Sequence, residues 1–202
     1  ARGIGLDGRI GAKFLHPGPG FGGSCFPKDT RALYQTSVEA EAPMRIVNTV
    51  IDINEKRKMD MAARIIDACG GSVSGRKIAV LGLTFKPNTD DMRESPSLDI
   101  VPALQAAGAN VRAFDPAGME EAKKLLDDVT WCADAYDALN GTDAVVIGTE
   151  WNEFRSLDFA RMKETMKSPI RVDWRNIYDA EHVVASGIAY SCVGRPNTAA
   201  AE

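Results

Sequence analysis

The stretch from Gly18 to Thr30, GPGFGGSCFPKDT, places one cysteine where it could act as a nucleophile. Glycines precede Cys25, and glycine lets the backbone come close to a ligand and offer its N–H groups. Pro27 suits the first turn of a helix, so Cys25 is expected just before a helix N-terminus with Lys28 nearby. Both features stabilise a thiolate. The opposing interpretation is a buried structural thiol, and the glycine-rich surroundings favour the nucleophile.

Two cations follow RKIAVLGLTF, an apolar run of the kind found in buried parallel strands. Lys86 and Arg93 lie in the next loop, FKPNTDDMRES, and serines open the helix after it. Ligands of doubly wound sheets bind at the carboxyl ends of strands, and cations beside a helix N-terminus attract anions such as phosphate. The two side chains could equally be solvated charges paired with the acidic residues between them. The GxGxxG turn of dinucleotide-binding proteins is absent here.

Composition narrows the classes of partner. The chain has 202 residues, 45% apolar and 26% charged, as in ordinary globular proteins, and a net charge of -4 without a basic stripe. We therefore expect no nucleic acid as a partner, and no apolar run is long enough to predict a membrane span or a secretory leader. Four widely spaced cysteines and only two histidines predict no metal site, and they favour a reducing, cytoplasmic compartment.

Alternating strand and helix patterns predict an α/β fold with a doubly wound, mostly parallel sheet. The expected strands cover residues 76–85, 110–116, 129–132, 143–150, 170–174 and 188–194. The expected helices between them cover residues 95–109, 118–128, 134–141, 157–166 and 180–187.

Ahead of the sheet, residues 43–69 follow one long helical pattern with two apolar lines, which predicts burial on more than one side. The helix is either a core helix of one domain or one that packs against its twin in a dimer, and we favour the dimer. A shorter helix carries Asp29 and Thr30 near its start and ends before Pro43. We expect two domains, residues 1–75 with the cysteine and the long helix, and residues 76–202 with the Rossmann-like sheet.

GFGGSCFPKDT resembles the active-site loop of the UDP-glucose/GDP-mannose dehydrogenase family. RIGAKFLHPGPGFGG, FKPNTDDMRESPS, TEWNEFR and VDWRNIYD also resemble that family, so the resemblance runs from about Arg9 to Pro196. It implies an NAD-dependent, four-electron oxidation of a UDP-sugar through a thiohemiacetal and a thioester on cysteine. Members that oxidise UDP-glucose fit best. The alternatives are a sister enzyme for GDP-mannose or a UDP-N-acetylhexosamine, and a non-catalytic nucleotide-sugar binding and dimerisation module.

The resemblance also assigns catalytic and cofactor roles. It makes Cys25 the nucleophile, and Asp29 helps to activate the hydrolytic water. It places Lys28 near NAD and Arg93 on the NAD pyrophosphate. Family members carry a further N-terminal Rossmann domain with the GxGxxG turn, and nothing here matches it, so we expect a fragment that lacks most of the NAD site.

Substrate binding is assigned in the same way. Phe85 and Lys86 would contact the UDP-sugar, which places residues 76–202 in the role of the UDP-sugar domain. Arg9 would reach the substrate of a neighbouring subunit, which implies a homodimer or a higher homo-oligomer. The other expected substrate-binding residues are Phe14, Leu15, His16, Pro17, Gly18, Pro19, Gly20, Phe21 and Gly22.

Overall fold

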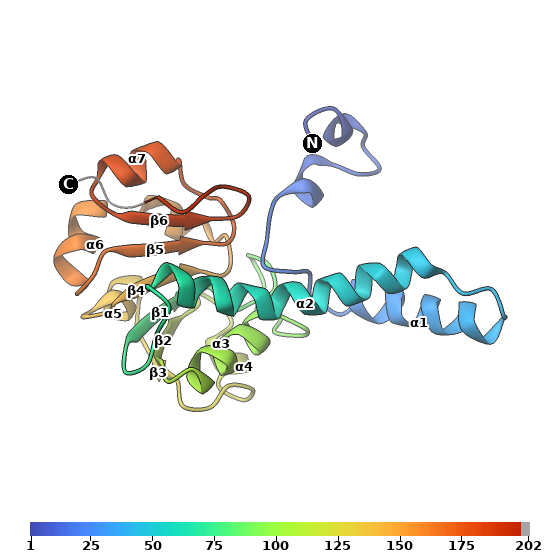
Figure 1. The fold of residues 1–202 in the computed structure, drawn as a ribbon, viewed down its shortest axis with the longest axis horizontal. Coiled ribbons are helices and arrows are strands. Elements are labelled where there is room, and N and C mark those ends of the chain that lie inside the picture. The colour runs from blue at the N-terminus through green and yellow to red at the C-terminus, as the bar shows by residue number, and fades with distance from the viewer. Residues whose placement is uncertain (199–202) are drawn as a thin grey trace.

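The chain forms a sheet domain from which two helices and the N-terminal segment extend, as the computed structural model of residues 1–198 shows (Figure 1). Six parallel strands form one sheet in the order β3-β2-β1-β4-β5-β6. Their bounds are Lys77–Leu81 (β1), Asn110–Phe114 (β2), Thr130–Trp131 (β3), Ala144–Ile147 (β4), Ile170–Asp173 (β5) and Ala189–Cys192 (β6). This confirms the predicted α/β fold with a doubly wound parallel sheet.

Helices cover both faces of the sheet, because side chains of adjacent strand residues point to opposite faces. Ile78 and Val80 of β1 pack in one core cluster with residues of α2 and α3, and Ala79 and Leu81 pack in a second cluster with residues of α5 and α6. The helices of the sheet domain are Ser97–Ala106 (α3), Met119–Ala122 (α4), Ala135–Leu139 (α5), Phe159–Thr165 (α6) and Ala180–Ala185 (α7).

Several elements are shorter than the sequence patterns predict. The first strand ends at Leu81 because Gly82 adopts a φ of 89°, which turns the chain out of the sheet. The helix expected over residues 118–128 is limited to α4, since the backbone of residues 124 and 125 bonds back in tighter turns and Asp128 has a φ of 54°. Each predicted strand and helix of the sheet domain nevertheless has an observed counterpart.

The helix predicted over residues 43–69 is α2, Arg45–Ala68, and the shorter helix before it is α1, Phe26–Glu39. The two pack together as an arm, which we define as α1 with the first half of α2 (Figure 1). The second half of α2 packs on the sheet, where Met61 and Ile65 are buried in the core. The second apolar line, Ile46, Val50 and Ile53, is exposed in this chain.

Two short 3-10 helices, Ile4–Leu6 and Ala12–Leu15, form an N-terminal segment that rises away from the arm and the sheet domain (Figure 1). Within residues 1–198, no helix has both the length and the apolar composition needed to cross a membrane. That part of the chain also holds no cluster of three or more potential metal-ligating residues.

Candidate active site around Cys25

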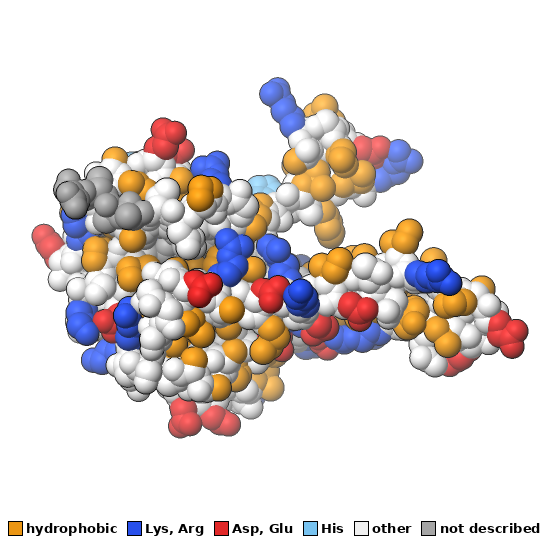
Figure 2. Space-filling view, in the orientation of Figure 1, with side chains coloured by type: hydrophobic (Ala, Val, Ile, Leu, Met, Phe, Trp, Pro, Cys, Tyr) orange, Lys and Arg blue, Asp and Glu red, His pale blue; other side chains and the backbone are white. Residues whose placement is uncertain are grey.

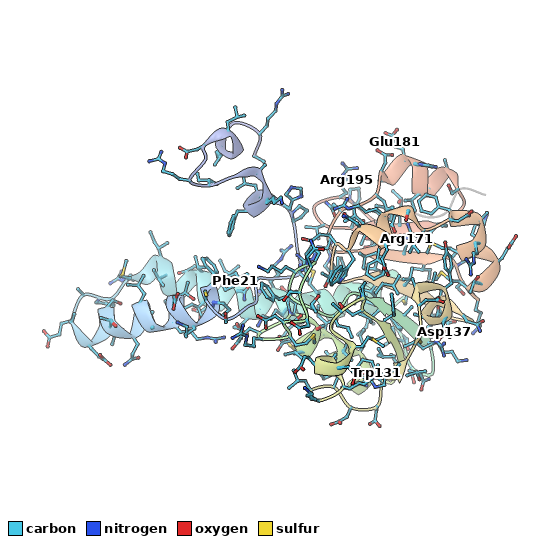
Figure 3. The ribbon with its side chains drawn as sticks, turned by 180° about the vertical axis from the view of Figure 1, so that it is seen from behind. Phe21, Trp131, Asp137, Arg171, Glu181 and Arg195 are labelled. Atoms are coloured by element: carbon cyan, nitrogen blue, oxygen red, sulfur yellow. The ribbon has the colours of Figure 1, made fainter. Side chains whose placement is uncertain are left out.

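A cavity of about 930 Å³ opens where the arm meets the sheet domain. Its size lies in the range typical of small-ligand sites. Residues from three parts of the chain line it: the glycine segment, defined as residues 13–24, the start of α1 with the facing side of α2, and the loop that follows β1. Phe21 of the glycine segment lies at this junction (Figure 3).

Cys25 lies at the N-cap position of α1 and is exposed to the cavity. The helix begins at Phe26 because Pro27 is already restricted to a helical φ and its missing N–H needs no partner in the first turn. The free N–H groups of that turn and the helix dipole favour a negative charge at this position. The structure therefore places the thiol as the sequence predicts, at a helix N-terminus in a glycine-rich loop.

Lys28 and Asp29 lie in the first turn of α1 and form an exposed ion pair of 2.5 Å, and neither residue lines the cavity. The pKa of Lys28 is raised, first by its hydrogen bond to Asp29 and in smaller part by the charge of Cys25. Arg93 has its pKa raised, first by Asp91 and also by Cys25. Two cationic side chains thus lie near enough to Cys25 to interact with its charge.

The glycine segment docks directly onto the loop of residues 85–94, which we call the cation loop. The Gly23 N–H donates to the Arg93 carbonyl oxygen at 2.8 Å. A Cβ on Gly22 would overlap the Glu94 carbonyl oxygen, and one on Gly23 would lie 2.8 Å from the Phe85 ring. Glycine is needed at Gly22 because the two backbones approach so closely, and at Gly23 because its φ is 87° and the Phe85 ring lies against it. This contact holds Phe85 near the cysteine.

Basic side chains outnumber acidic ones around the cavity. Lys86 lies over the Phe85 ring at 5.1 Å from its centroid, and Asp91, which carries the acidic group of the described lining, is paired with Arg93 at 2.7 Å. The Arg93 hydrogen bond holds the pKa of Asp91 below its usual value. The other basic residues of the lining are Lys13, His16, Arg57 and Arg175. The cavity therefore suits an anion.

The lining also contains residues that were not predicted from the sequence, among them Arg175, Asn54 and Arg57. Arg175 follows β5 and donates from Nε to the Gly148 carbonyl oxygen at 2.7 Å and from Nη2 to the Phe85 carbonyl oxygen at 3.2 Å. Asn54 and Arg57 come from α2. Arg175 could have been found by the rule that identified Lys86, since both follow the carboxyl end of a strand. Asn54 could have been noticed as a polar residue on a buried apolar line.

The predicted site residues do not all meet in the cavity. Those that line it are Phe14, His16, Pro17, Gly18, Gly20, Phe21, Gly22, Cys25, Phe85 and Lys86. Leu15 instead faces Gly5 in the N-terminal segment, and Pro19 lines a separate small cavity over β1. Lys28, Asp29 and Arg93 are not among the lining residues, and neither is Arg9, which is exposed and pairs with Asp7 at 2.6 Å.

The topological switch point between β1 and β4 does not fit a dinucleotide. In a doubly wound sheet this crevice receives the pyrophosphate. Here the hydroxyls of Ser95 and Ser97 both donate to the Leu83 carbonyl oxygen, at 2.6 and 2.5 Å. A Cβ on Gly82 would lie 2.6 Å from Thr149, and the remaining cavity is about 20 Å³. Ser95 and Ser97, hydrogen-bonded to Leu83, therefore fill the crevice in which an ordinary Rossmann domain binds NAD.

Comparison with known proteins gives consistent matches over nearly the whole chain. Residues 79–180 match the UDP binding domain of the UDP-glucose/GDP-mannose dehydrogenase family, and residues 1–56 match its central domain. UDP-glucose 6-dehydrogenase of Rhizobium meliloti is 57% identical over 98% of this chain and 45% of its own length. UDP-glucose 6-dehydrogenase TuaD of Bacillus subtilis is 46% identical over 97% of this chain and 42% of its own length.

A solved structure of a UDP-glucose dehydrogenase from Pyrobaculum islandicum superposes with a TM-score of 0.79 at 36% identity. It covers 94% of this chain and 41% of the other. This chain thus spans less than half the length of the relatives it matches. The cysteine at the N-terminus of α1, the parallel sheet and these matches agree. The chain belongs to the UDP-glucose/GDP-mannose dehydrogenase family.

Proposed function

We propose that this chain supplies the nucleotide-sugar site and the catalytic cysteine of a UDP-glucose 6-dehydrogenase, which oxidises UDP-glucose to UDP-glucuronate with NAD. The observation that carries the proposal is the single cavity shared by Cys25, the glycine segment and Lys86. A nucleophile and an anion-binding wall in one cavity suit a reaction on the sugar of a nucleoside diphosphate sugar. The relatives named above are UDP-glucose dehydrogenases, which supports this substrate over GDP-mannose or a UDP-N-acetylhexosamine.

The UDP moiety would lie along the basic part of the cavity. Backbone N–H groups of the glycine segment, Lys86 and Arg175 would face its phosphates, because charge-assisted donors recognise phosphate oxygens. Phe85 would offer an aromatic face. The more exposed Arg9 would serve the substrate of a neighbouring subunit, as the family resemblance implies. The sugar would then extend toward Cys25.

The oxidation balances around C6 of the sugar. The C6 alcohol loses a proton and a hydride to become an aldehyde, and the Cys25 thiolate adds to its carbon to form a thiohemiacetal. A second hydride leaves to give a thioester, and water hydrolyses that bond to release the carboxylate and the thiol. A serine would be a poorer nucleophile at neutral pH and would form a less reactive ester. Asp29, one turn from Cys25, would help to activate the water.

Two molecules of NAD, bound in turn, would each accept one of the two hydrides. The closed switch point of this sheet supports an NAD site built mainly from the part of the relatives that this chain does not match. Lys28, two residues after the lining residue Phe26, and Arg93, which is paired with the lining residue Asp91, would meet the cofactor from this side. By itself, the chain fits the alternative description of a nucleotide-sugar binding and dimerisation module, with the boundary between its two functional parts at residues 75 and 76.

We also propose that the chain assembles as a homodimer or a higher homo-oligomer through α2 and acts in the cytoplasm. The exposed apolar line Ile46, Val50 and Ile53 supports the assembly. The four cysteines are free thiols, which supports a reducing compartment.

Replacement of the nucleophile tests the mechanism in a full-length protein that carries this chain. Cys25→Ser should lower UDP-glucuronate formation by at least about a hundredfold, because the thioester cannot form. UDP binding should stay unchanged, since the two side chains are nearly isosteric. Product is measured by chromatography and UDP binding by calorimetry. Undiminished acid formation by Cys25→Ser would exclude the covalent mechanism.

A further inference from the structure

Arg57 differs from the other polar residues of α2 that face the glycine segment. Asn54 is 4% exposed, and its amide bonds both backbone groups of Phe21, accepting from the N–H at 2.8 Å and donating to the carbonyl oxygen at 3.1 Å. Lys58 is 2% exposed and forms ion pairs of 3.3 Å with Glu55 and Asp99. Both side chains are therefore committed to holding the fold.

Arg57 commits only one edge of its guanidinium group. Its Nε donates to the Gly18 carbonyl oxygen at 2.8 Å, and the side chain lines the main cavity. Its Nη1 and Nη2 make no hydrogen bond or ion pair with any residue in the described range 1–198. Because Nε is hydrogen-bonded and the two Nη groups are not, the guanidinium group of Arg57 can donate to a second acceptor in the cavity.

Arg175, in the loop after β5, also lies close to Gly18. Its Nη1 lies 3.1 Å from the position that a Cβ of Gly18 would occupy. The guanidinium groups of Arg57, from α2, and Arg175, from the loop after β5, thus both lie close to Gly18. Two guanidinium groups at one backbone position form a local positive centre. Asp91 is paired with Arg93 at 2.7 Å, and Glu150 lies 3.2 Å from Arg175 Nε, so Arg57 is the one of the two arginines without an acidic partner within residues 1–198.

We propose that Arg57 is a substrate-binding residue that contacts the phosphates of a nucleoside diphosphate sugar. Nε fixes the Gly18 carbonyl oxygen, and the open Nη groups donate to phosphate oxygens in the planar, charge-assisted geometry that arginine provides. The long helix then has a role in recognition as well as in packing. The inference rests on the proposed function and adds a phosphate ligand from α2 to it.

Calorimetric titration of this 202-residue chain with UDP tests the inference. Arg57→Gln should weaken UDP binding by roughly ten- to a hundredfold, as expected for the loss of a charge-assisted hydrogen bond. Arg57→Lys should have an intermediate affinity, because it keeps the charge but cannot serve Gly18 and phosphate together. Lys56→Gln is the matched control: it removes one charge from the adjacent, exposed position outside the cavity and should leave the affinity unchanged.

Amide hydrogen exchange separates direct binding from an effect on the loop. The Phe21 N–H is bonded to Asn54, so it should remain protected in Arg57→Gln and lose protection in Asn54→Ala. If Arg57→Gln weakened UDP binding only together with the loss of Phe21 protection, Arg57 would be a loop-positioning residue and the inference would be wrong.

Two further outcomes separate this inference from the proposed function. Unchanged UDP affinity in Arg57→Gln, with normal UDP binding by the original chain, would overturn the role of Arg57 and leave the UDP site intact. Failure of the original chain to bind UDP would overturn the UDP site together with its Arg57 contact.

Discussion

At the scale of single residues, accessibility separates Cys25 from the other three cysteines. Cys69, Cys132 and Cys192 are only 2–4% exposed, and burial raises the pKa of each thiol. Cys25 is exposed and stands at the start of a helix with cations nearby. Since a reagent must reach a thiol to react with it, Cys25 is the accessible position among the four.

Alkylation should therefore label Cys25 first. With limiting iodoacetamide at pH 7, we expect Cys25 to react more than about tenfold faster than the three buried thiols. Peptide mapping by mass spectrometry measures the ratio. In urea the four cysteines should react at similar rates, which controls for differences in peptide recovery. Faster labelling of a buried cysteine in the native chain would contradict this assignment.

The chemistry of individual residues was predictable to different degrees. Cys25 and Lys86 are identifiable from the sequence because their neighbours determine their setting, a helix start in one case and a strand end in the other. Arg57 is not, because its role depends on which carbonyl oxygen the helix brings to its Nε. Pro19 shows the same limit: it lies inside the glycine segment but faces the sheet, and the local sequence does not encode that direction.

At the scale of elements, an ion pair joins helix α1 to the cation loop. Arg31 of α1 donates from both terminal nitrogens to the Glu94 carboxylate, at 2.9 and 3.1 Å. Glu94 itself has a φ of 52°, so the pair helps to retain an uncommon backbone conformation beside Gly22. The helix that carries Cys25 and the loop that carries Lys86 are thus held together.

This pair should make stability depend on pH. The Arg31 hydrogen bond holds the pKa of Glu94 below its usual value of 4.5. A carboxyl group with a lower pKa in the folded state stabilises the fold above the unfolded pKa, and that contribution is lost as the pH falls through the folded value. We expect Glu94→Gln to lower the free energy of unfolding by about 0.2–1 kcal/mol at pH 7, because both side chains are partly exposed.

Urea denaturation between pH 7 and pH 3 measures the difference. It should shrink as the pH falls below 4.5 and disappear once Glu94 is protonated in both states. Glu164→Gln changes an exposed glutamate of α6 whose side chain has no ion pair within residues 1–198, and should have no comparable effect. A pH-independent difference for Glu94→Gln would show that the carboxylate charge is not responsible.

The order and type of the elements follow from sequence because each strand alternates with a helix at regular spacing. Their ends follow less well. Gly82 ends β1 because it adopts a left-handed φ, which cannot be read from the apolar run around it. Helix α4 likewise ends early because of local backbone turns that its sequence pattern does not indicate. The closed switch point was also beyond sequence analysis, since it depends on two serine hydroxyls converging on one carbonyl oxygen.

At the scale of the whole molecule, the cavity lies at the junction between the arm and the sheet domain, and α2 runs through both. Its second half is part of the sheet's core, while its first half carries apolar side chains outward (Figure 2). Ile46 is 81% exposed and Ile53 61% exposed. An exposed apolar line of this kind supports the proposed assembly through α2. Val50 and Ile53 also line the cavity, so the surface and the site are continuous.

A single charged side chain introduced at Ile46 should prevent assembly through this surface. The original chain should sediment as a dimer at micromolar concentration, and Ile46→Glu should sediment as a monomer with an unchanged circular dichroism spectrum. Ile46 makes little contact within its own chain, so the substitution should not affect folding. Leu125→Glu places the same charge on another exposed apolar residue, far from the arm, and should remain dimeric. A monomeric original chain would exclude a dimer formed by this chain alone. A dimeric Ile46→Glu would place the interface elsewhere.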